Sequence, residues 1–196
     1  QRLMELRSVG KVEKFIIALE EAIDKQRKVM LKGYASSNSN EIRDRLVVPV
    51  NLVCDNENLW AYDLQDKALK EFRLARIGSI ETNIDDPEYP HAFPKGEADV
   101  FRWINPKVNL HIRLEMTIAA LNSLREEYHD ACKLPPEELY QTEAGTWILD
   151  TRLHGLGAAR RFCIGLADQV KILDSENADA LRDDIRKFVT MHLGGQ

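Results

Sequence analysis

Hydrophobic and polar positions alternate with two different periods in the first part of the chain. Within residues 11–26, apolar side chains recur every three or four positions, which is the spacing of an amphipathic helix. Short runs rich in β-branched and aromatic residues follow at 28–34, 45–54, 58–64 and 71–82, separated by polar turn stretches. This pattern predicts one helix followed by a small β-barrel or a strongly bent sheet.

A different pattern begins at residue 109. Alternation predicts a strand over 109–117, and Thr117 is placed to cap the helix that follows it. Two strands, a helix, a strand and a final helix are predicted next, at 138–143, 146–154, 155–166, 169–175 and 178–189. Ser175 is the predicted N-cap of the final helix. The order β-α-β-β-α-β with a closing helix is that of a small α+β sandwich and resembles a ferredoxin-like fold.

The two patterns are separated by "DDPEYPHAFPKGEAD", residues 85–99. Three prolines and a glycine among acidic residues cannot continue a helix or an inner strand, so this stretch is interpreted as a linker. The predicted fold class is therefore α+β with two domains. The predicted segments are an N-terminal linker helix, a small barrel, a Pro-rich linker and a C-terminal α+β domain, at 1–26, 27–84, 85–107 and 108–196.

Composition narrows the class of protein. The chain has 196 residues, of which 44% are hydrophobic, and no apolar run approaches the length of a membrane span. Its three cysteines, Cys54, Cys132 and Cys163, have no C-x-x-C spacing. We therefore expect reduced thiols, a cytoplasmic location, no membrane association and no zinc site. Because the sequence opens on Gln1, we expect it to be a piece of a longer protein.

The formal net charge of −5 makes the chain a poor candidate for binding duplex DNA unaided. Residues 24–80 are the exception, with ten basic against eight acidic side chains. Any site for a polyanion is therefore expected to lie within this segment.

Three arginines in the basic segment are candidate ligand contacts. If residues 71–82 form one strand, Arg76 shares a face with buried Phe72 and Leu74, and Arg73 points the other way. The planar guanidinium is well suited to clamping a phosphate, because it stays charged and presents paired donors. Arg45 adds a third charge if its strand lies alongside.

Aromatic side chains in the neighbouring strands could stack on bases; they are Tyr34, Trp60 and Tyr62. Arginine beside aromatic residues on a small barrel is typical of proteins that bind single-stranded nucleic acid. The alternative is architectural. Arg76 could instead pair with Asp63, Glu81 or Glu57, and the aromatic rings could belong to the core.

The segments "RLVVPVNLV" and "LWAYDLQDKALKEFRLARIGSIE" together resemble the WYL domain. The resemblance rests on Arg45 and Pro49 in the first segment, and on residues 59–63 and 72–77 in the second. Residues 109–194 are similar to the C-terminal extension that often follows such a domain. One departure is that the tripeptide that gives the family its name reads Glu-Asn-Leu here, at 57–59.

The resemblance implies the sensing region of a bacterial transcriptional regulator. Such regulators usually carry an N-terminal helix-turn-helix domain that binds promoter DNA, and we expect that domain to be missing from this sequence. The WYL domain itself is implied to be an Sm-like β-barrel that binds a nucleotide or a single-stranded nucleic acid, often within a homodimer.

No motif indicates an enzyme, a metal or a cofactor. The glycines of "HGLGAARR" (154–161) lack the third glycine and the parallel context of a dinucleotide loop, so they are interpreted as turn residues. "HDAC" (129–132) offers too few ligands for a tetrahedral metal. Two hypotheses remain: a ligand-sensing module, and a structural oligomerisation module that binds no small ligand.

Overall fold

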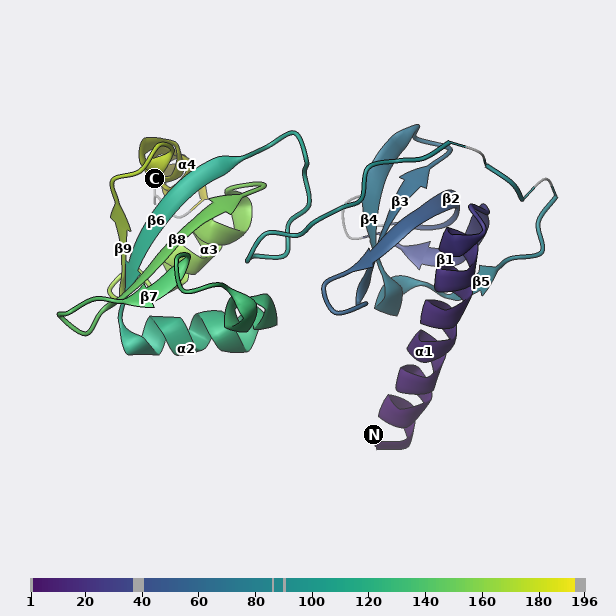
Figure 1. Ribbon diagram of the computed structural model, residues 1–196, viewed down its shortest axis with the longest axis horizontal. Helices are drawn as coiled ribbons and strands as arrows, with labels where there is room; N and C mark the ends of the chain where they lie inside the picture. The colour runs from purple at the N-terminus through teal and green to yellow at the C-terminus, as the bar shows by residue number, and fades with distance from the viewer. Residues whose placement is uncertain (1, 37–40, 86, 90, 193–196) are drawn as a thin grey trace. The chain divides into compact units, whose positions relative to one another are not determined.

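The chain is described by a computed structural model that covers residues 2–36, 41–85, 87–89 and 91–192 (Figure 1). It divides into two compact units, residues 1–96 (unit 1) and 97–196 (unit 2). Within the described ranges the fold is mixed α/β, with four α-helices and two antiparallel sheets. No helix in those ranges combines the length and the apolar character needed to span a membrane.

Unit 1 consists of a helix and a five-stranded sheet. Its elements are α1 (Arg2–Asp24), β1 (Val29–Ala35), β2 (Ile42–Val53), β3 (Asn58–Asp63), β4 (Ala68–Arg73), the 3₁₀ turn η1 (Leu74–Arg76) and β5 (Ser79–Glu81). The strand order is β4-β3-β2-β1-β5, with every pair antiparallel. Phe15 and Leu19 of α1 pack with Leu59 and Ala61 of β3 in one buried cluster, so α1 covers one face of the sheet.

The strand predicted over 71–82 is wrong. The chain leaves the sheet after β4, makes the turn η1, and re-enters at the opposite edge, where β5 pairs with β1. At this crossing the backbone of Gly78 approaches β1 closely, and its amide donates to the carbonyl of Lys32 at 2.9 Å. A Cβ at this position would lie only 2.7 Å from that carbonyl oxygen. Arg76 therefore lies on a 3₁₀ turn, and the strand alternation that placed it beside Phe72 does not apply.

The two edges of this sheet are β4 and β5, and no pairing joins them among the described strands. A five-stranded antiparallel sheet is thus present, while its strong bending and its closure into a barrel stay predictions. Residues 37–40, between β1 and β2, lie outside the described residues.

Unit 2 has a four-stranded sheet with its helices following the predicted order. Its elements are β6 (Leu110–Met116), α2 (Ile118–Glu127), the 3₁₀ helix η2 (His129–Lys133), β7 (Leu139–Gln141), β8 (Trp147–Leu153), α3 (Gly157–Gly165), β9 (Val170–Leu173) and α4 (Ala178–His192). The strand order is β7-β8-β6-β9. The Thr117 cap is confirmed, since its hydroxyl accepts from the Ala120 amide at 3.2 Å. The Ser175 cap is wrong, because α4 begins at Ala178 and Ser175 lies two residues before the cap position, with its hydroxyl donating to the carbonyl of His111.

The Pro-rich stretch is divided between the two units, and each part packs on its own unit. The amide of Tyr89 donates to the Gln26 carbonyl, and the Lys28 amide donates to the carbonyl of Pro87. Beyond the unit boundary, Val100 and Phe101 are buried in the core of unit 2. The stretch predicted as a linker thus contributes to the packing of each unit that it joins.

Candidate functional site

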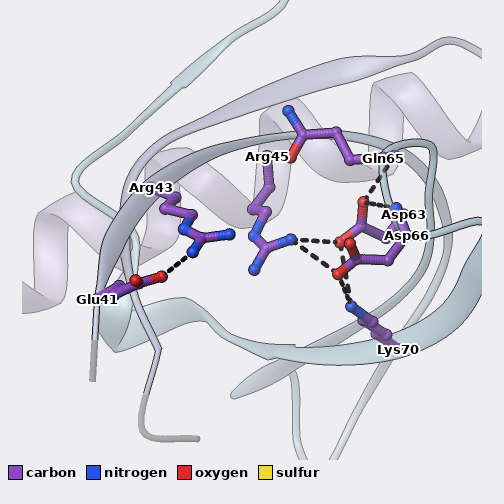
Figure 2. Close-up of polar contacts among 7 residues, drawn as sticks. All are labelled: Glu41, Arg43, Arg45, Asp63, Gln65, Asp66 and Lys70. Atoms are coloured by element: carbon purple, nitrogen blue, oxygen red, sulfur yellow. Dashed lines mark hydrogen bonds and ion pairs between the residues drawn. The ribbon is translucent and has the colours of Figure 1, made fainter. Parts of the chain in front are cut away.

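Arg45 is held in a partly buried cluster of charges from β2, β3, β4 and the turn between β3 and β4 (Figure 2). One guanidinium nitrogen, Nη1, donates to Asp63 Oδ2 at 3.1 Å and to Asp66 Oδ2 at 2.9 Å. Lys70 contacts the same two carboxylates from the other side. Asp63 is fully buried, and Arg45 is only 9% exposed. Two cations and two anions balance here, so the cluster has no surplus charge to attract an anionic ligand.

The cluster also shapes the turn between β3 and β4. Asp63 Oδ1 accepts from the backbone amides of Gln65 and Asp66, at 2.9 and 3.2 Å. A hydrogen bond from Lys70, together with the charges of Lys70 and Arg45, lowers the pKa of Asp66 against a smaller opposing effect of desolvation. These contacts place Arg45 in the framework of unit 1, which is the architectural role that the sequence left open for an arginine.

Arg73 has a very different environment at the end of β4. Its neighbour Phe72 is buried in the core, so alternation places Arg73 on the sheet face away from α1. The side chain is 51% exposed, and its guanidinium lies 3.8 Å from the Glu57 carboxylate. The contact is loose enough for the guanidinium to turn toward a ligand. Arg76 follows on η1, is partly buried, and also interacts with other groups of the chain.

Asn58 pairs with Arg73 across the two strands and is 8% exposed. Its amide nitrogen donates to the carboxylate of Glu71. Its carbonyl oxygen Oδ1 is buried and has no hydrogen-bond partner among the described residues. An unsatisfied buried acceptor is uncommon in proteins. Asn58 therefore places, beside Arg73, a carbonyl oxygen that can still accept a hydrogen bond.

The three predicted aromatic residues are divided between the two faces of the sheet. Tyr34 is buried in the cluster under α1, with its ring edge-on to Phe72 at a centroid distance of 5.1 Å. Its hydroxyl accepts from the Arg73 amide at 3.3 Å. Trp60 and Tyr62 alternate with the core residues Leu59 and Ala61, and so lie on the outer face.

Both outer aromatic residues have partners within unit 1, which leave Tyr62 partly exposed and Trp60 buried. Tyr62 stacks on Phe93 with ring centroids 4.3 Å apart and planes 14° from parallel. The Trp60 indole nitrogen donates to the carbonyl of Pro94 at 3.2 Å. Trp60 is 4% exposed. Phe93 and Pro94 come from the stretch that was predicted to be a linker, and nothing in the sequence indicated where this stretch would pack.

The structure therefore separates the six predicted site residues. Trp60, Tyr62 and Arg73 share the outer face of the sheet, which we define as the face away from α1. Arg45 and Tyr34 lie on the α1 face, because each accompanies core residues there. Arg76 lies on the turn beyond the strand.

Comparison with known proteins identifies the domain. Residues 14–82 match the family model of the WYL domain. The chain contains a WYL domain. The match begins within α1, so the second half of this helix belongs to the WYL domain together with the sheet.

Two solved structures are similar in part. Proteasome accessory factor B/C (PafBC) of Arthrobacter aurescens is 21% identical, with 92% of this chain and 28% of that chain covered and a TM-score of 0.39. A CRISPR Cas-related protein is 9% identical, with 98% and 52% covered and a TM-score of 0.46. The chain thus spans under a third of the first protein and about half of the second. No curated protein matches the chain.

Proposed function

We propose that the chain is the effector-sensing region of a bacterial transcriptional regulator, and that the outer face of its WYL domain binds a short single-stranded nucleic acid or a nucleotide. The observation that carries the proposal is the gathering of Arg73, Trp60 and Tyr62 on this one face. Aromatic faces accept stacked bases and arginine accepts phosphate, which is the usual combination for single strands.

The spacing on the outer face favours an extended ligand. Tyr62 and Asn58, the cross-strand partner of Arg73, are separated by four positions on β3, or about 13 Å of strand. A ligand that stacks on Tyr62 and reaches Arg73 must extend over this length, so a short oligonucleotide fits better than a mononucleotide. Arg76 follows Arg73 closely and is proposed as a second phosphate contact.

Arg45 is assigned to the framework and not to the ligand. Its guanidinium would have to leave Asp63, a fully buried carboxylate, before it could hold a phosphate. Removing one partner of a buried ion pair is strongly unfavourable, so an exposed arginine with a loose contact is the better donor. Tyr34 likewise keeps a core role.

The wider architecture is part of the same proposal. The open five-stranded sheet with its N-terminal helix is proposed to be an Sm-like barrel fold, and unit 2 a ferredoxin-like domain. We also propose that the protein acts as a cytoplasmic homodimer, without enzymatic activity, and reaches promoter DNA through a helix-turn-helix domain outside this sequence.

Binding of labelled single-stranded DNA and RNA, followed by fluorescence anisotropy at several salt concentrations, tests the proposal. Arg73→Ala and Arg76→Ala should each weaken binding about 10- to 150-fold, because a hydrogen bond to a charged group contributes roughly 1.5–3 kcal/mol. Each should also reduce the slope of log K against log salt concentration by about 0.7 for every phosphate that the variant no longer neutralises. Arg186→Ala is the matched control, since this exposed arginine lies on α4 in unit 2. Equal affinities for Arg73→Ala and Arg186→Ala would contradict the proposal.

The second candidate is a structural oligomerisation module that binds no small ligand. The internal pairing of Arg45 with Asp63 favours it, because one of the predicted ligand arginines then has an architectural role. Any ligand that binds the folded state raises the melting temperature. If the chain is only an oligomerisation module, no nucleotide should therefore raise it. A melting temperature that rises with oligonucleotide concentration therefore excludes this candidate.

A further inference from the structure

The segment His91–Gly96, which we term the strap, lies on the outer face of the unit 1 sheet. Phe93 stacks on Tyr62, the carbonyl of Pro94 accepts from Trp60, and Gly96 is bound by Asn51 of β2. The strap thus covers both aromatic side chains that share the face with Arg73.

Two hydrogen bonds hold the C-terminal end of the strap on the sheet. Asn51 Oδ1 accepts from the Gly96 amide, and Asn51 Nδ2 donates to the Gly96 carbonyl, each at 2.9 Å. Gly96 lies so close to the indole of Trp60 that a Cβ there would be 2.6 Å from the ring. Gly96 is also the last residue of unit 1. Unit 2 begins at the next residue, Glu97, so this fastening lies at the boundary of unit 1.

The middle of the strap is held differently, by an aromatic ring. The Phe93 and Tyr62 planes are nearly parallel at a centroid distance of 4.3 Å, which is the arrangement in which a nucleobase stacks on tyrosine. Both rings are partly exposed. Phenylalanine offers no hydrogen bond, so a base of equal or larger ring area can replace it on Tyr62.

We propose that the strap is an intramolecular competitor of the ligand. Phe93 occupies the position of one nucleobase on Tyr62, and a bound single strand displaces the strap from the outer face. Displacement breaks the Asn51–Gly96 fastening and frees residues 91–96, which lengthens the connection between unit 1 and unit 2. The strap thereby converts ligand binding into a change in the coupling of the two units. This inference rests on the proposed function for its choice of a nucleobase ligand.

Phe93→Ala tests the competition directly by anisotropy with a labelled single-stranded oligonucleotide. The variant should bind at least roughly 2- to 10-fold more tightly than the unchanged chain, which is the equilibrium equivalent of removing the Phe93–Tyr62 pair; the weaker stacking of Phe93 on Tyr89, with ring centroids 5.9 Å apart, is lost as well. Phe188→Ala is the matched control: it removes an equally partly buried phenylalanine from α4 of unit 2 and should leave the affinity unchanged. Asn51→Ala releases the strap at its other end and should raise the affinity in the same direction. Asn51→Ala therefore tests the same competition if Phe93→Ala does not fold.

Hydrogen exchange measured by mass spectrometry provides the second readout. The oligonucleotide should accelerate exchange in peptides covering residues 91–96, because the Gly96 amide loses its acceptor on Asn51. This inference would be overturned if Phe93→Ala and Asn51→Ala bound the oligonucleotide no more tightly than the unchanged chain and the ligand slowed exchange in the strap. The proposed function would still stand in that case. Absence of binding in the unchanged chain and in both variants would overturn the proposed function, and this inference with it.

Discussion

Arg45 and Arg73 show how strongly two arginines of one sheet can differ. Arg45 is 9% exposed and binds two aspartates, whereas the Arg73 side chain is 51% exposed and lies 3.8 Å from one glutamate. The sequence places both in the same basic segment and gives no means of separating them, because their difference arises from contacts between strands.

Stability measurements should distinguish these two arginines. Arg45→Ala leaves the buried carboxylate of Asp63 with fewer donors, so urea unfolding should show a loss of about 3 kcal/mol. Arg73→Ala removes an exposed pair and should change the free energy of unfolding by less than about 1 kcal/mol. Equal losses in the two variants would contradict the roles assigned to them.

The cysteines should differ in reactivity in the native protein. Burial raises the pKa of the Cys163 thiol to about 12, so almost no reactive thiolate is present at pH 8. Cys132 is exposed and accessible to reagents. Iodoacetamide followed by mass spectrometry should label Cys132 first, and should label Cys163 only after unfolding. Comparable native labelling of both would show that Cys163 is not buried as described.

At the scale of elements, alternation and turn residues predicted the elements that are fixed by local sequence. β1, β2, β3 and the α2 cap at Thr117 appear close to their predicted positions. The break of the predicted strand 71–82 was beyond such reasoning, because it depends on β5 pairing with β1, a contact between residues about fifty positions apart. A run of alternating residues cannot reveal that its two halves belong to opposite edges of a sheet.

Gly78 should be sensitive to substitution because of that crossing. Gly78→Ala places a Cβ 2.7 Å from the Lys32 carbonyl oxygen, a backbone atom, and should destabilise unit 1 by about 1–3 kcal/mol. Gly10→Ala is the control, since nothing lies within 4 Å of a Cβ there and α1 should gain about 0.5–1 kcal/mol. Thermal melts of the two variants that shift by the same amount and in the same direction would be inconsistent with the close approach at Gly78.

At the scale of the whole molecule, the strap is the feature that composition could not locate. Prolines and Gly96 excluded a helix or an inner strand, and this is correct for the described part of the stretch. Where the strap packs depends on Asn51, Trp60 and Tyr62, which are too distant in sequence for local patterns to connect. The sequence could therefore indicate the six candidate residues by their chemical type. It could not predict which of them lie on each face of the sheet.

Truncation should show that the strap belongs to unit 1. Residues 1–96 contain a hydrophobic core of their own and should melt cooperatively as a separate fragment. A fragment that ends at residue 90 lacks only the strap and loses its contacts with Trp60 and Tyr62, so it should melt roughly 5 °C or more lower. Identical melting temperatures would indicate that the strap contributes nothing to unit 1.

The most direct test of the outer-face site is photo-crosslinking with a single-stranded oligonucleotide that carries 5-bromouracil. We expect crosslinks, mapped by mass spectrometry, in the β3 peptide that contains Trp60 and Tyr62, with an increased yield in Phe93→Ala. Crosslinks confined to unit 2, or to the Arg45 face of the sheet, would contradict the assignment of the ligand to the outer face of the WYL domain.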